Sequence, residues 1–224
     1  MRRFLLSGLL IVVSAAATGA QVDSAARNPA DRAMNAELSK IMEATRANGL
    51  PVEPIVAKIN YGLLMKAPPA RIIAAARATA DRLEEARNAL APHPSESDIT
   101  EGEKALSSHV SVKALKDIRK VAANRPVAVP LGVLSQLVVS GVDEPKAAKI
   151  VTDLIRKGAS VQQIADLGNE VNSDVQLGAK PNNALDLRMN RLTAVLGVPT
   201  GAAAADLGLT AGASSPTPPG RKKP

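Results

Sequence analysis

The two histidines, His93 and His109, could bind a metal or transfer protons near neutral pH. They stand 16 residues apart, without the one-turn spacing that lets two ligands on one helix bind the same ion. His93 lies between two prolines, and the sequence has no cysteine. We therefore expect exposed or capping histidines, no metal site and no cofactor.

Paired carboxylates could act as general acid and base. Neighbouring residues on a helix do not face each other, and acidic residues at a helix start are stabilised by the helix dipole. These structural roles explain three pairs: Glu84 with Glu85, Glu101 with Glu103 in an expected first helical turn, and Asp143 with Glu144 just before an expected helix. The chain also lacks phosphate-binding glycine loops and serine-nucleophile motifs. We expect no catalytic and no cofactor-binding residue.

Tyr61 is the only aromatic residue after position 20, and Gly62 follows it inside an expected helix. Filling of the core is the simpler interpretation of the tyrosine. The alternative is that an aromatic side chain beside a helical glycine marks a groove where another chain approaches closely. Tyr61 and Gly62 are thus the candidate residues of a partner groove.

Charge and composition argue against several function classes. The formal net charge is +7, but residues 141–199 hold seven basic and seven acidic side chains, and the signs alternate along each segment. A nucleic-acid binder concentrates Lys and Arg on one face. Scarce aromatic residues also disfavour stacking on sugars or single-stranded bases. We expect no nucleic-acid partner.

The elements that must position any site are helices. Apolar residues recur with helical period, no segment alternates with period two, and prolines and glycines punctuate the pattern. This predicts an all-α fold without a sheet, a compact helical bundle or a short α-solenoid of αα-hairpins. About eight or nine helices are expected, in segments at 29–49, 51–67, 69–90, 97–108, 111–123, 131–140, 145–157, 160–178 and 181–197.

Two of these segments resemble each other. Shifting residues 53–74 by 91 positions gives nine identities in 22, which include the helix-opening Glu-Pro. We predict a duplication with half-repeats 30–110 and 111–197; the alternative is that two Ala-rich amphipathic hairpins look alike for physical reasons. In the first copy, the expected buried stripe is Ile55, Ile59, Leu63 and Leu64.

Both ends of the chain differ from its middle. Residues 1–20 combine two arginines, an apolar run of about 10 residues and small residues, which predicts a cleaved secretory signal peptide too short to span a bilayer. A linker at 21–29 and a helical domain at 30–197 follow. Residues 198–224, rich in Ala, Gly, Pro and Ser, predict a disordered tail with a basic end at Arg221, Lys222 and Lys223.

These observations predict an exported, non-lipidated bacterial protein, periplasmic or extracellular and soluble, with no transmembrane segment in the mature chain. The first hypothesis for its function is a helical interaction or scaffold module with an envelope protein as partner. A second is a peripheral binder of anionic membrane or polymer through the basic tail. A third is an enzyme with scattered carboxylates such as Glu103 and Asp153.

Overall fold

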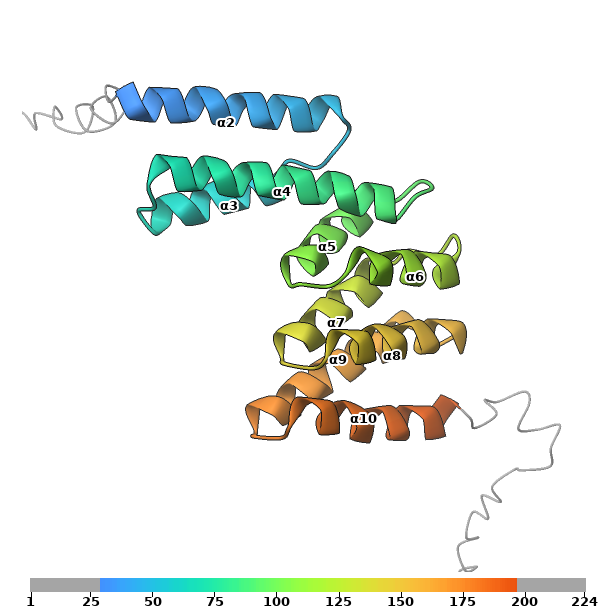
Figure 1. The fold of residues 1–224 in the computed structure, drawn as a ribbon. Helices are drawn as coiled ribbons and strands as arrows, with labels where there is room; N and C mark the ends of the chain where they lie inside the picture. The colour runs from blue at the N-terminus through green and yellow to red at the C-terminus, as the bar shows by residue number, and fades with distance from the viewer. Residues whose placement is uncertain (1–28, 197–224) are drawn as a thin grey trace, which may run out of the picture. The chain divides into compact units, whose positions relative to one another are not determined.

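The computed structural model describes residues 29–196, and every element assigned there is an α-helix (Figure 1). The predicted all-α fold without a sheet is confirmed for this part of the chain. The predicted signal peptide, the tail and its basic end lie outside the described residues. Contacts divide the chain into two compact units between Asn88 and Ala89; the half-repeat boundary at 110/111 stays a prediction.

Unit 1 contains α2 (Pro29–Ala47), α3 (Glu53–Leu64) and nearly all of α4 (Pro69–Ala89). Polar bonds connect α2 to α4: the Arg77 guanidinium pairs with Glu37, and Arg87 Nη1 donates to the carbonyl oxygen of Asn48 at 2.7 Å. Met34 and Leu38 of α2 are buried. These two side chains of α2 therefore face the interior of this unit.

The predicted stripe of α3 is only partly correct. Ile55 is fully buried and Ile59 half-buried, but Leu63 is 49% and Leu64 78% exposed. Helical period predicts which residues share a face, and it does not reveal whether another element covers that face. The outward part of α3 is therefore an exposed apolar surface.

Unit 2 is a short α-solenoid of three helical hairpins (Figure 1). The first helix of each hairpin packs on the next, α5 on α7 and α7 on α9, while α6 packs on α8 in a second layer. Each hairpin thus buries its apolar faces mainly on its neighbours, as in repeat proteins. The six helices are α5 (Glu96–Ser107), α6 (Val112–Ala122), α7 (Ala128–Val139), α8 (Glu144–Arg156), α9 (Val161–Gln176) and α10 (Pro181–Leu196).

Helix starts in unit 2 follow local side-chain chemistry. Ser111 and Ser160 accept hydrogen bonds from the third backbone N–H of α6 and α9, as their sequence context predicts. The predicted start of α7 at 131 is wrong, because this helix begins at Ala128 and includes Pro130 in its first turn. Proline is tolerated there, since the first N–H groups of a helix have no partner within the helix.

The internal sequence match corresponds to matching helix bounds. A shift of 91 residues carries Glu53, where α3 begins, onto Glu144, where α8 begins, with proline next in both helices. In each case four residues lie between the end of the helix and the start of the following one. Duplication itself stays a prediction, because similar hairpins can share these bounds for physical reasons.

Gly168 lets α9 approach α7 closely. A Cβ atom at this position would lie 3.0 Å from Cγ1 and 3.3 Å from Cγ2 of Val133. A valine side chain is short and rigid at χ1, so it cannot move away as a long side chain can. Gly132 of α7 differs, because its nearest neighbour is the flexible carboxylate end of Glu101 at 3.3 Å.

We predict that Gly168→Ala lowers the free energy of unfolding by about 1–2 kcal/mol, because overpacking outweighs the helix propensity gained. The matched change Gly132→Ala should raise it by up to about 1 kcal/mol, since alanine is the better helix former. Urea denaturation followed by circular dichroism measures both variants. Equal effects of the two changes would contradict the close contact of α7 with α9.

Candidate functional site

The predicted partner residues Tyr61 and Gly62 point to different roles. Tyr61 is 62% exposed, so the interpretation that it fills the core is wrong. A Cβ atom on Gly62 would lie 2.9 Å from Cγ1 of Ile72, so this glycine accommodates α4 of the same unit. Gly62 therefore has an explanation within the chain, whereas Tyr61 belongs to the exposed surface of α3.

The structure separates the other residues considered for chemistry. His93 and His109 are both exposed, as expected. Glu103 is buried on α5, whereas Asp153 lies on α8 and lines a groove to which Glu103 does not contribute. The structure therefore gives no reason to combine these two carboxylates in one site.

Carboxylates of all three predicted pairs lie beside structural partners, and Glu84 lies 3.5 Å from Arg87 Nη2. Glu144 accepts hydrogen bonds from Ser111, Asp143 accepts one from Asn182, and Glu101 pairs with Lys104. Glu101 and Glu103 are not in a first turn as expected, because α5 already begins at Glu96. Within residues 29–196, the helices bring no three histidine or acidic side chains together as a metal-binding group.

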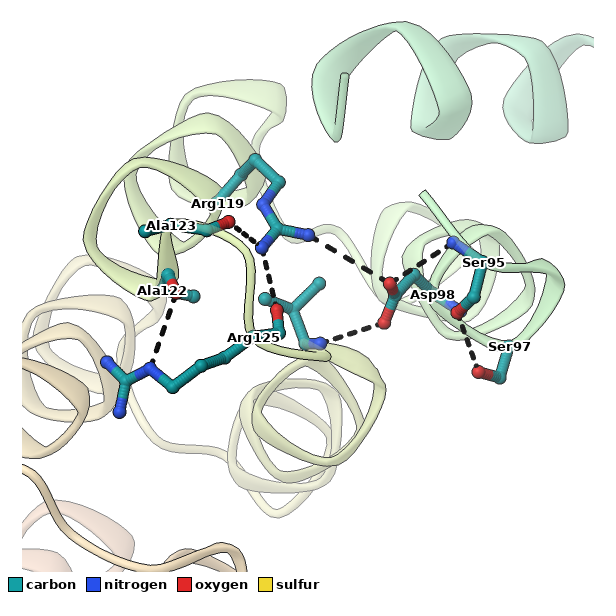
Figure 2. Close-up of polar contacts among 8 residues, drawn as sticks. Ser95, Ser97, Asp98, Arg119, Ala122, Ala123 and Arg125 are labelled. Atoms are coloured by element: carbon teal, nitrogen blue, oxygen red, sulfur yellow. Dashed lines mark hydrogen bonds and ion pairs between the residues drawn. The ribbon is translucent and has the colours of Figure 1, made fainter. Parts of the chain in front are cut away.

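A buried polar junction lies where α5, α6 and α7 meet (Figure 2). The Asp98 side chain caps its own helix by accepting from the Ser95 backbone N–H at 3.3 Å. Its other oxygen accepts from the backbone N–H of Val127, the residue before α7, at 2.8 Å. Asp98 is only 3% exposed. One carboxylate therefore fixes the start of α7 against the start of α5.

Arg119 of α6 provides the counter-charge. Its guanidinium lies 4.0 Å from the Asp98 carboxylate and donates to the carbonyl oxygens of Ala123 and Arg125 (Figure 2). Arg125 in turn donates to Ile155 at the end of α8. Among the described residues, no buried side-chain polar atom lacks a partner. Because the cluster is closed and satisfied, its role is structural.

The candidate binding site is a groove of about 710 Å³ between α6 and α8. Its floor is formed by small or apolar residues, and charged side chains stand along both edges. A cavity of this volume is large enough to hold a small ligand or several side chains of a peptide. The small or apolar lining residues that are buried or half-buried, called the floor, are Ala114, Val121, Ala148 and Thr152; the other lining residues are Ser111, Lys113, Asp117, Lys120, Glu144, Pro145, Lys149, Asp153 and Arg156.

A hydrogen-bonded clamp holds the groove at one end. Glu144 at the first position of α8 accepts from both the backbone N–H and the hydroxyl of Ser111, the N-cap of α6, at 3.1 and 2.8 Å. The same two helices therefore start side by side, and the groove runs between them. Its width at this end is set by a single glutamate.

Most charges at the groove edges neutralise one another along their own helices. Asp153 accepts from Lys149 at 2.9 Å and from Arg156 at 2.5 Å, and the hydrogen bond from Lys149 is the main cause that lowers the Asp153 pKa. Lys113 donates to Asp117 at 2.6 Å, which raises the Lys113 pKa. These pairs are surface pairs, so they define a polar edge and add little stability.

The sequence contains weak signals for this groove. The internal match includes Ala148 and Lys149, but nothing in local sequence shows that α6 lies beside α8. The clamp between Ser111 and Glu144 spans 33 positions, a separation that helical periodicity does not address.

The bidentate pairing of Arg188 with Asp174 fixes α10 on α9. Arg188 Nε and Nη2 donate to the two carboxylate oxygens at 2.6 and 2.7 Å, and Nη1 donates to Glu170 at 2.9 Å. This geometry lowers the pKa of Asp174 and raises that of Arg188. The lining of a hollow of about 250 Å³ beside this pairing includes Glu170 and Arg188, which bind each other.

We predict that Asp98→Ala lowers the free energy of unfolding by about 3 kcal/mol, because it leaves the Val127 N–H buried without its acceptor and the Arg119 guanidinium buried without its counter-charge. Urea denaturation measures this change. Asp166→Ala is the matched control, since Asp166 is exposed and accepts only from Gln162 of its own helix; it should cost less than about 0.5 kcal/mol. Similar losses for both variants would refute the structural role of the junction.

The Asp153 carboxyl is expected to titrate below its ordinary pKa of 3.8. Because the folded pKa is the lower one, the pairing stabilises the fold above the ordinary pKa, and this stabilisation disappears as the pH falls through the folded value. Carboxyl carbon shifts in NMR measure the midpoint. Lys149→Met should raise the midpoint, whereas Lys180→Met, a change at an exposed lysine outside the groove, should leave it unchanged.

None of the described helices has the length and apolar character needed to cross a bilayer. Comparison with known protein families, with curated protein sequences and with solved structures finds no match. The function is therefore argued from the geometry and chemistry of the chain itself.

Proposed function

We propose that this protein is an exported helical interaction module that holds a segment of a protein partner in the groove between α6 and α8. The single observation that carries the proposal is the lining of this groove, in which small or apolar residues lie among charged side chains of both helices. Protein interfaces have the same arrangement, with an apolar centre inside a polar rim. A small-molecule enzyme site would instead need polar groups that converge on one point.

The solenoid architecture also supports a protein partner. Successive hairpins of such folds create extended surfaces along a layer of helices, and α6 and α8 are neighbours in one layer. A bound segment would lie along the floor at Ala114, Val121 and Ala148, while Lys149 and Asp153 at one edge and Lys113 at the other contact its polar side chains. Small floor residues leave room for the large side chains of the partner.

The predicted signal peptide assigns this partner to the bacterial envelope or its exterior. The alternative binding mode, attraction of the basic end to anionic lipid or polymer, depends on residues outside the described range. A tail-deleted chain separates the two possibilities, because all residues that line the groove lie between Ser111 and Arg156.

We expect Ala148→Trp to reduce capture of the partner at least about tenfold, because the indole fills the groove floor. The assay is chemical cross-linking of tagged protein in the producing bacterium, followed by quantitative mass spectrometry of what co-purifies. Ala165→Trp is the matched control: Ala165 has similar partial exposure but lines a different hollow, beside α7. Circular dichroism verifies that both variants fold.

Removal of residues 198–224 should leave capture unchanged if the groove binds the partner. Loss of capture on this deletion, together with full capture by Ala148→Trp, would overturn the proposal in favour of attachment through the tail. Equal loss with both tryptophan variants would show that capture does not depend on the groove.

A further inference from the structure

The outward face of α3 is the most exposed apolar helix surface in unit 1. Leu64 is 78%, Tyr61 62% and Met65 60% exposed, and Leu63 and Val56 follow at 49% and 38%. Exposed apolar patches of this kind mark interaction sites more often than single exposed residues do. The groove between α6 and α8 belongs to the other unit, so this face is a separate surface.

Comparison with α8 indicates how such a face packs when neighbouring helices cover it. The 91-residue shift that aligns the two helices carries Val56, Leu63 and Leu64 onto Ala147, Leu154 and Ile155. All three residues of α8 are buried, and α8 packs against α6 and α7. The corresponding face of α3 is therefore of a type that buries against helices, yet it stays exposed.

We propose that the α3 face is a homodimer contact, in which α3 of a second copy packs antiparallel across a two-fold axis at Asn60. A two-fold contact requires a surface that complements itself. Positions equally distant from Asn60 satisfy this condition: Val56 is opposite Leu64 of the other copy, and the small Ala57 is opposite Leu63. Asn60 meets its own counterpart, where the two amides can hydrogen-bond.

The charges at the ends of α3 favour a second copy as the occupant. Glu53 begins the helix, Lys66 follows its end, and both are exposed. Antiparallel pairing about Asn60 places Glu53 of one copy opposite position 67 of the other, next to Lys66, at both ends of the contact. Opposite charges in these places select the antiparallel arrangement, because a parallel pair would place like charges together.

The contact is small, so we expect a reversible dimer. Twelve residues of helix extend about 18 Å, and one helix pair buries less than the roughly 800 Å² per partner of a standard stable interface. Association should therefore appear at tens to hundreds of micromolar, as for weak transient complexes.

Sedimentation of the predicted mature chain, residues 21–224, tests the proposal over this concentration range. Wild type should shift from monomer to dimer as concentration rises. Leu64→Arg should weaken association at least about tenfold, since it places a charge in the contact. Leu177→Arg is the matched control, because Leu177 is 84% exposed but lies in unit 2; its dimerisation should equal that of wild type.

Charge reversal tests the orientation. Glu53→Lys and Lys66→Glu should each weaken the dimer severalfold, because each change creates two like-charged pairs. The double variant should recover most of the lost association, since both pairs are restored with inverted signs. Failure of the double variant to recover, while it retains wild-type helicity, contradicts antiparallel pairing.

A single cysteine locates the axis, because the chain has none of its own. Under mild oxidation Asn60→Cys should form a disulfide-linked dimer at least tenfold faster than Asn190→Cys, a change at an exposed position of α10. Wild type that stays monomeric across the range, or equal rates for the two cysteine variants, overturns the proposal.

Discussion

The order of the first two hairpins of unit 2 depends on one buried carboxylate. Asp98 accepts from the Ser95 N–H at the start of α5 and from the Val127 N–H at the start of α7, and Arg119 of α6 balances its charge. The fold depends on these bonds because Asp98 is buried. A buried ion that loses its partners lowers the stability of a protein by several kcal/mol, on the order of 3–5. Asp98 thereby fixes the register in which the apolar faces of α5 and α7 meet.

The groove is a consequence of that ordered stack. Once α5 and α7 are aligned, α6 and α8 lie side by side in the other layer, and the bond from Glu144 to Ser111 holds their first turns together. The residues between them are small at Ala114 and Ala148, so the helices are joined at their starts without filling the space along their length. A satisfied buried junction and an open surface groove thus arise from the same arrangement.

Local chemistry made much of this fold predictable. The helical period, the serine caps at Ser111 and Ser160 and the breaks at glycine are contained within a few residues, so the helices and most of their bounds follow from the sequence. Asp98 could not be predicted, because its partner Val127 is 29 positions away and an isolated aspartate has no distinctive pattern. Proline gave a wrong bound at Pro130, since its position in a helix depends on where that helix begins.

For the candidate sites too, the sequence pattern does not show which other elements cover a residue. Tyr61 is a candidate because it is the only aromatic residue after position 20, but composition does not distinguish a core position from an exposed one. The buried stripe predicted for α3 is only partly correct, because Leu63 and Leu64 are uncovered and coverage depends on other elements. The α6–α8 groove combines residues from two hairpins, and no pattern within either hairpin predicts it.

The hairpin stack of unit 2 also sets how the chain opens locally. α7 contacts α5, α8 and α9, whereas α10 packs on α9 and reaches α8 through polar side chains such as Lys146. In a one-dimensional stack, opening begins at elements with few neighbours and costs most in the middle. Amide hydrogens of α10 therefore exchange with solvent through small openings near that end, whereas those of α7 are released only when the whole stack separates.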